Sequence, residues 1–167
     1  KIKKMLAICW GMQVAVTAAG GEVQKCEKGT HRGIAHKIKI NDSGLKHALY
    51  KDKSNDFNTP AFNFDEVSKI PENSIILSSN SINSIQGLNF KIKDCDIWGI
   101  QYHPEISYEK MIRLIHFRTD RLIDKKAFKD QNEINNHVQM IEKENKVSNK
   151  NLRMMELRNW LNYLNEN

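Results

Sequence analysis

The chain has 167 residues, of which 40% are hydrophobic and 28% charged, a composition typical of a globular protein that can bury one sizeable core. No apolar run reaches the roughly 20 residues that a membrane helix needs, and no signal-peptide pattern is present, so we expect neither a membrane nor a secreted protein. The net charge of +6 is spread evenly and is not interleaved with aromatic residues, which argues against nucleic-acid binding.

The first predicted feature is a sharp turn around Cys9. An apolar strand, residues 5–8, leads into this cysteine, and a helix-compatible segment, residues 12–19, leads out of it. Small residues two positions before and after the cysteine, Ala7 and Gly11, are what a strand-to-helix elbow needs, because larger side chains would collide there. Such a turn exposes the thiol near a helix N-terminus, which favours a thiolate. The alternative is a buried structural cysteine.

Polar turns and short strands follow the elbow. Gly20 and Gly21 end the helix, and the alternating isoleucines of residues 34–40 predict a half-buried strand. The nearby histidines do not have metal-ligand spacing, so we expect them at the surface or at strand edges; they are His31, His36 and His47. Residues 51–60 are polar and rich in turn-forming residues, which predicts a loop.

Strands dominate the chain up to residue 102. Residues 74–79 and 82–90 are predicted strands, and residues 90–92 and 97–100 are predicted to flank a turn as a hairpin. The second arm of this hairpin continues as a buried strand to Tyr102 and delivers His103 and Glu105 at its C-terminal end. These two side chains leave the same face of an extended backbone, because they are two positions apart.

Helices are predicted beyond residue 106. Ser107 is a candidate N-cap, and apolar residues recur at helical spacing through about residue 124. Further helices are centred on residues 134–141 and 157–164, with a polar, loose connection predicted over residues 142–150. The aromatic and methionine residues near Trp160 are interpreted as packing residues.

Cysteine usage points to a reducing compartment. The three cysteines form an odd number without metal-like spacing, which fits a cytoplasmic protein, and Cys26 and Cys95 are expected to be passive. No P-loop or dinucleotide-type glycine pattern occurs, so we predict no metal and no cofactor.

Two stretches together resemble a known family. Residues 8–13, Ile-Cys-Trp-Gly-Met-Gln, and residues 99–105, Gly-Ile-Gln-Tyr-His-Pro-Glu, are similar to the motifs of the class I (triad) glutamine amidotransferases, in particular to stand-alone proteins similar to the GMP synthase glutaminase domain. The resemblance covers most of residues 4–124. It implies an α/β, three-layer, flavodoxin-like fold over residues 1–124, with a mostly helical C-terminal extension over residues 125–167 packed on the same domain. In that family several strands and a glycine-bearing loop precede the elbow, so we expect this chain to hold a partial domain that lacks its N-terminal strands.

The resemblance also implies roles for individual residues. Cys9 would be the nucleophile and His103 the base, with Glu105 orienting the imidazole. The backbone N–H of Trp10 would be an oxyanion donor.

The remaining site residues are expected around the substrate. Gln13 and Gly11 would lie beside the bound glutamine. Asn63 stands where the family commonly has the histidine of a His-x-Asp pattern, while Asp65 keeps its match.

Three functions follow from these motifs. The leading one is a glutaminase that releases ammonia, with glutamine as substrate and an ammonia-accepting synthetase as partner. The second is a γ-glutamyl peptide or amide hydrolase that uses the same triad. The third is a catalytically inactive regulatory or scaffold homologue, against which the intact Cys-His-Glu set argues.

Overall fold

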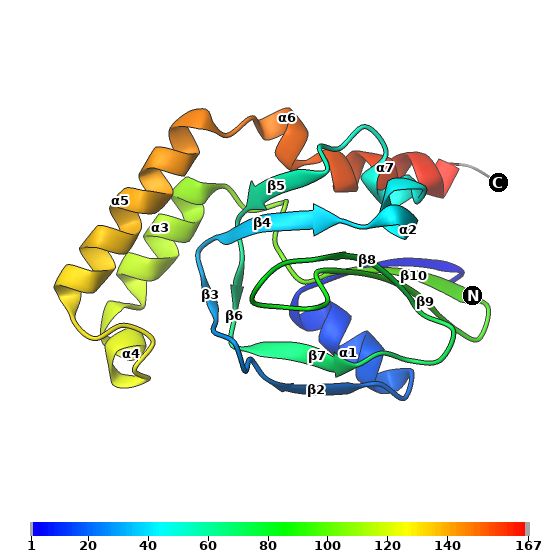
Figure 1. Cartoon of the computed structure of the whole chain (residues 1–167), viewed down its shortest axis with the longest axis horizontal. Helices are drawn as coiled ribbons and strands as arrows, with labels where there is room; N and C mark the ends of the chain where they lie inside the picture. Colours follow the sequence, from blue (N-terminus) through cyan, green and yellow to red (C-terminus); the bar gives the residue numbers. More distant parts are fainter. Residues whose placement is uncertain (1, 166–167) are drawn as a thin grey trace.

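A mixed six-stranded sheet forms the centre of the chain, as seen in a computed structural model that describes residues 2–165 (Figure 1). Its strand order is β1-β10-β9-β8-β4-β5. Two short ladders, β2–β7 and β3–β6, lie beside it. The strands are β1 (Lys4–Ile8), β2 (Glu22–Lys25), β3 (His31–Arg32), β4 (Ala35–Ile40), β5 (Asp56–Thr59), β6 (Phe62–Asn63), β7 (Asp65–Lys69), β8 (Ile75–Ser79), β9 (Gly87–Ile92) and β10 (Cys95–Ile100).

The helices surround this sheet and extend from it. They are α1 (Trp10–Ala18), α2 (Asp42–Leu45), the 3-10 helix η1 (Ala48–Tyr50), α3 (Tyr108–Phe117), α4 (Thr119–Asp124), α5 (Gln131–Val147), α6 (Lys150–Arg153) and α7 (Met155–Asn165). No helix within residues 2–165 is both long and apolar enough to cross a membrane.

Alternation along the strands gives the sheet two apolar faces. Ala7 of β1 packs in one cluster with Met12 and Val16 of α1. Its neighbours Leu6 and Ile8 pack in the opposite cluster, because successive side chains of a strand point to opposite faces. That second cluster contains Trp98 of β10, whose ring stacks on Tyr163 of α7 with ring centroids 4.4 Å apart. The α/β fold with helices on both faces of the sheet is therefore as predicted.

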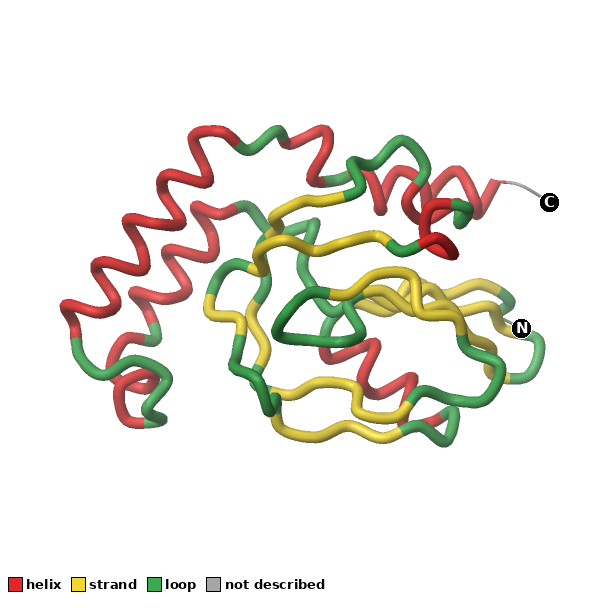
Figure 2. The backbone as a smooth tube through the Cα atoms, viewed as in Figure 1, coloured by secondary structure: helices red, strands yellow, loops and turns green. Residues whose placement is uncertain are grey.

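A helical hairpin forms the third part of the core. Figure 2 shows α3 and α5 running side by side, away from the strands. Ile115 of α3 and Ile141 of α5 are fully buried in one cluster with Phe128 and Ile134. Ser107 caps α3 as predicted, by accepting a hydrogen bond from the Lys110 N–H.

Several element boundaries differ from the predictions. Residues 56–59 of the predicted loop form β5, which gains a ladder with β4 despite its turn-forming residues. The strand predicted over residues 82–90 begins only at Gly87, because the preceding residues make a buried polar cluster instead of a ladder. Helix α5 continues to Val147 through the stretch predicted to be loose.

Candidate active site

Cys9 lies on a strained turn between β1 and α1. Its backbone angles are φ 52° and ψ −112°, a conformation that non-glycine residues rarely adopt and that costs about 1–3 kcal/mol. Two hydrogen bonds hold the turn: the Cys9 N–H donates to the Ile100 carbonyl over 2.7 Å, and the Gln13 N–H donates to the Cys9 carbonyl over 3.2 Å. This is the strand-to-helix elbow that the sequence predicted.

The partner strand brings His103 to the same edge of the sheet. Strand β1 pairs with β10 in parallel, and Ile8 lies opposite Ile100. Cys9, which follows Ile8, and the loop that follows Ile100 therefore begin side by side at the same edge of the sheet. The backbone N–H of His103 donates to the Pro60 carbonyl over 2.8 Å, which fixes the loop that carries the imidazole. Sulfur and imidazole, 94 positions apart in the chain, meet through this register.

The imidazole is held from both sides. Its Nδ1 lies 2.6 Å from Glu105 Oε1, which leaves Nε2 as the nitrogen available to the thiol. Burial by itself lowers the pKa of His103. Hydrogen bonding to Cys9 and Glu105, together with their negative charges, outweighs burial and raises this pKa to about 9. At neutral pH the ring therefore carries the proton that a leaving amine requires.

Titration of His103 tests this arrangement. We expect the ring carbons of His103, followed by NMR, to titrate near pH 9. In Glu105→Gln and Cys9→Ala variants the pKa should fall, because each substitution removes one of the groups that raise it while the burial that lowers it remains. The exposed His116, on α3, is the internal control. A His103 pKa that is unchanged in both variants would contradict the contact.

A second side chain reaches the sulfur. Gln101, which is fully buried, donates from Nε2 to Cys9 Sγ over 3.5 Å, and its Oε1 accepts from Gln13 Nε2 over 3.1 Å. The sulfur also lies 3.8 Å from the Phe62 carbonyl, to which the thiol can donate. No sequence motif had indicated a role for Gln101. A polar side chain at the end of an apolar strand, two positions before the histidine, was the available signal.

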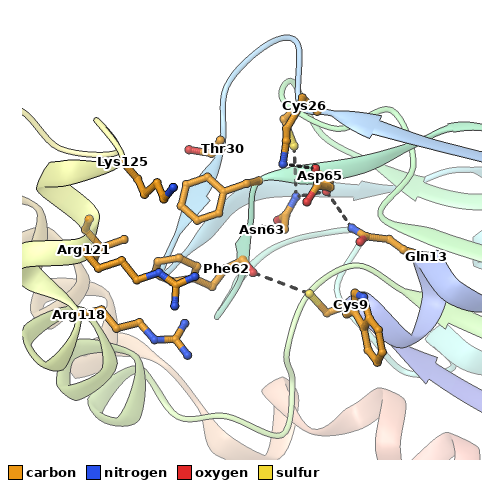
Figure 3. A pocket seen from close by; sticks show the side chains of 14 residues that line it. Cys9, Gln13, Cys26, Thr30, Phe62, Asn63, Asp65, Arg118, Arg121 and Lys125 are labelled. Carbon is orange, nitrogen blue, oxygen red and sulfur yellow. Dashed lines mark hydrogen bonds and ion pairs between the residues drawn. The ribbon is translucent and has the colours of Figure 1, made fainter.

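Cys9 opens onto a cavity of about 710 Å³ between α1, β6 and α4 (Figure 3). The lining residues are Cys9, Trp10, Gln13, Lys25, Cys26, Thr30, Phe62, Asn63, Phe64, Asp65, Arg118, Arg121, Leu122 and Lys125. Its volume lies within the range of small-molecule sites. The imidazole of His103 is not part of this lining; it reaches the sulfur from the loop after β10.

The predicted substrate residues divide into two groups. Gln13 and Asn63 line the cavity, and both hydrogen-bond to the Asp65 carbonyl, over 2.9 and 3.0 Å. Trp10 also lines it with a side chain that is 75% exposed. Gly11 does not line the cavity. A Cβ built on Gly11 meets nothing within 4 Å, so the expectation that a side chain there would crowd the elbow is wrong: its Cα–H faces open space.

A buried polar network lies next to Asn63. Asn63 Nδ2 donates to Asn83 Oδ1 over 3.2 Å, and Asn83 in turn donates to a Glu66 carboxylate oxygen over 2.6 Å. His31 belongs to this network and is only 1% exposed, so it does not lie at the surface; it begins β3 of a two-stranded ladder, which agrees with the strand-edge position that was the other expectation. Burial lowers the pKa of His31 to about 4, which keeps its imidazole neutral. Cys26, predicted to be passive, lines the cavity beside the network, and burial raises its pKa.

Sequence comparisons place these features among known proteins. A family model described as "Glutamine amidotransferase class-I" matches residues 2–119. A γ-glutamyl-L-1-hydroxyisopropylamide hydrolase of a Pseudomonas species is 27% identical over 179 aligned residues, which cover 96% of this chain and 60% of that protein. One subunit of the glutamine-hydrolysing GMP synthase of Methanocaldococcus jannaschii is 33% identical over 104 residues, covering 62% of this chain and 52% of that protein.

Solved structures share the fold. A glutamine amidotransferase of Thermotoga maritima superposes with a TM-score of 0.69 at 20% identity, over 97% of this chain and 62% of that one. A glutamine amidotransferase of Methylobacillus flagellatus gives a TM-score of 0.66 at 15% identity, over 94% of this chain and 61% of that one. The chain thus spans between 52% and 62% of the length of these four relatives.

Proposed function

Because the chain belongs to the class I glutamine amidotransferase family, we propose that it hydrolyses the side-chain amide of glutamine through a thioester on Cys9. The observation that carries this proposal is the grouping of Cys9, His103 and Glu105: the parallel pairing of β1 with β10 brings the thiol and the imidazole to one edge of the sheet, and the imidazole lies 2.6 Å from the carboxylate. These are the groups that an activated nucleophile requires.

The proposed reaction has two halves. The Cys9 sulfur attacks the amide carbon, and His103 holds the proton that the thiol has lost. The tetrahedral intermediate collapses as the C–N bond breaks, and His103 gives its proton to the nitrogen, so that ammonia leaves and a γ-glutamyl thioester remains. Water then gives a proton to His103 and attacks the thioester, which releases glutamate and returns the thiol. Proton transfer of this kind contributes roughly 10²–10⁴-fold in rate.

Backbone and side-chain groups around the elbow complete the proposed site. The Trp10 N–H, on the residue after the nucleophile, would stabilise the oxyanion, as in other nucleophile elbows. Gln13 and Asn63 would contact the substrate, since both line the cavity beside Cys9. We do not propose a substrate contact for Gly11.

Gln101→Leu tests whether the buried amide supports this chemistry. The change removes the donor to the Cys9 sulfur and the acceptor for Gln13 while keeping the volume and the burial. We expect kcat for glutamine to fall roughly 10–100-fold, because a hydrogen bond to a charged atom is worth about 1.5–3 kcal/mol. Gln101→Glu is the matched polar control, and it should also shift the pH–rate profile because it places a second carboxyl beside the sulfur. Unchanged kcat in Gln101→Leu would exclude this role.

Release of ammonia by the purified protein tests the function itself. We expect glutamine to yield ammonia and glutamate in equal amounts. No release of either, from glutamine or from any γ-glutamyl amide, would contradict the proposal and would favour an inactive regulatory homologue. The thiols of all three cysteines are free, and a reducing compartment such as the cytoplasm would keep Cys9 usable.

The proposal has two forms, which differ in the amine that is released: ammonia passed to a synthetase, or a larger amine released by a hydrolase. The matched GMP synthase protein is named as one subunit of that enzyme, which favours a chain that passes ammonia to a synthetase partner. The size of the cavity, and an aligned amide hydrolase that covers nearly the whole chain, favour a second candidate, a γ-glutamyl amide hydrolase with a larger leaving amine. Comparing glutamine with γ-glutamyl amides as substrates distinguishes the two.

A further inference from the structure

One side of the Cys9 cavity is strongly basic. Arg118, Arg121 and Lys125 line it from the end of α3 and from α4, and all three are exposed. The side chains of these three residues make no ion pair or hydrogen bond with any residue between 2 and 165. Arg121 lies within α4, and Arg118 and Lys125 are the residues that flank this helix, so three like charges lie within about two turns of one another and repel.

The rest of the lining does not neutralise these charges. The only carboxylate among the lining residues of the described chain is Asp65, and it is already paired with Lys25 over 2.7 Å. Three positive charges therefore face the cavity without a counter-ion. An anionic ligand group is attracted to this wall, and a cationic group is repelled from it.

The two ends of the cavity differ in charge and in distance from the elbow. Figure 3 shows Gln13, Asn63 and Asp65 on the Cys9 side, and the three basic residues on the opposite side, across the ring of Phe62. On the Cys9 side Asn63 Oδ1 is buried without a hydrogen-bond partner within residues 2–165, and the carboxylate of Asp65, although paired with Lys25, is 41% exposed. The α-ammonium group of a glutamyl substrate fits that end by its charge.

This placement decides which part of the substrate can reach the basic wall. The α-ammonium and the α-carboxylate of a glutamyl group are attached to one carbon, so both stay near the Asp65 end. A group that contacts Arg118 and Arg121 must come from the other half of the substrate, beyond the scissile amide. The cavity of about 710 Å³ has room for more than a single amino acid.

We propose that the preferred substrate is a γ-glutamyl amide whose leaving amine carries an anionic group, as in a γ-glutamyl amino acid. The carboxylate of the leaving half would bind the wall formed by Arg118, Arg121 and Lys125. The inference rests on the proposed Cys9 chemistry and adds a substrate class to it. Hydrolysis would then break the same C–N bond, and His103 would protonate an amino acid in place of ammonia.

Three substrates test the assignment. γ-Glutamylglycine has an anionic leaving half, γ-glutamylglycinamide is its neutral counterpart, and glutamine has no leaving half beyond ammonia. We expect kcat/KM for the first to exceed that for the second about tenfold, since two or three exposed charge pairs each contribute a modest factor. The preference should shrink with added salt, because exposed charges are screened.

A double variant locates the preference. Arg118→Gln/Arg121→Gln is expected to remove most of the advantage of γ-glutamylglycine and to change kcat/KM for the other two substrates less than about twofold. Arg113→Gln, an exposed arginine on α3 outside the cavity lining, is the matched control and should leave all three values unchanged. An equal loss for all three substrates would assign the wall to the glutamyl half, and no loss for any would show that it does not touch the substrate; either result overturns the proposal.

Measurements of binding test the anionic site independently of catalysis at Cys9. If the parent protein turns over none of the substrates, the proposed function fails, but affinity can still be measured by calorimetry with γ-glutamylglycine and its amide. Tighter binding of the acid than of the amide, lost in Arg118→Gln/Arg121→Gln, would support the anionic site on its own. Equal affinities for the two ligands would overturn it.

Discussion

Replacing Cys9 with alanine is expected to reduce ammonia release from glutamine by roughly 10⁴-fold or more, because the sulfur is the atom that forms the covalent bond. Hydrolysis in the variant would depend on water alone, held near the remaining imidazole. The measurement is ammonia and glutamate formed under identical conditions by the parent and by Cys9→Ala. Mass spectrometry after rapid quenching should also show a γ-glutamyl adduct in the parent and none in the variant.

A second thiol in the same cavity provides the matched control. Cys26 lines the cavity that Cys9 opens onto, but burial raises its pKa, which disfavours the thiolate. Cys26→Ser is therefore expected to retain most of the activity. Loss of activity in Cys26→Ser together with retained activity in Cys9→Ala would show that Cys26, and not Cys9, is the nucleophile. Circular dichroism of both variants verifies that the fold is preserved.

Replacing Lys53 with methionine is expected to lower the free energy of unfolding by about 3–5 kcal/mol, because it leaves the Glu156 carboxylate buried without its cation. Glu156 is fully buried and the Lys53 side chain is only 3% exposed; Nζ lies 2.8 Å from Glu156 Oε2. The hydroxyl of Tyr102 donates to the other carboxylate oxygen over 2.6 Å. Through Glu156, α7 is therefore hydrogen-bonded to Tyr102, the residue that immediately precedes His103.

An exposed pair of the same type and length gives the comparison. Lys69 lies 2.8 Å from Glu22, and both side chains are 63% exposed. Lys69→Met should cost far less stability than Lys53→Met, because water replaces an exposed partner. Urea unfolding at neutral pH measures both variants. The double variant Lys53→Met/Glu156→Leu should recover much of the lost stability, since no buried charge remains. Equal losses for Lys53→Met and Lys69→Met would refute the account.

Local patterns predicted those parts of the site that are contiguous in the chain. Cys9 directly follows β1, and His103 and Glu105 follow β10 within five positions, so the parallel pairing of the two strands was enough to bring them to one edge of the sheet. The catalytic roles of these residues stay predictions until activity is measured. The α/β fold was predictable for the same reason, because it follows from strand periodicity and from motifs that a family shares.

Features that depend on distant contacts were not predictable. Gln101 reads as one more strand residue until its amide is seen beside the sulfur. His31 looks like a surface histidine, yet Asn80 and Gln86, about fifty positions later, enclose its ring. The steric role expected of Gly11 failed because the direction of its missing side chain, into open space, depends on the exact rotation of α1.

The basic wall illustrates the same limit. Arg118, Arg121 and Lys125 are ordinary surface residues of a helical segment when read along the chain. Only the hairpin of α3 and α5, which carries α4 to the cavity that Cys9 lines, turns them into neighbours of the nucleophile (Figure 1).

The left-handed backbone at Cys9 has a consequence for how this protein can vary. Glycine would adopt φ 52° and ψ −112° with less strain, so Cys9→Gly is a substitution that would relieve backbone strain at the elbow while removing the nucleophile. Natural homologues that have lost catalysis should therefore often have glycine at the elbow. A cysteine that is retained there in spite of the backbone strain indicates selection for a reactive thiol.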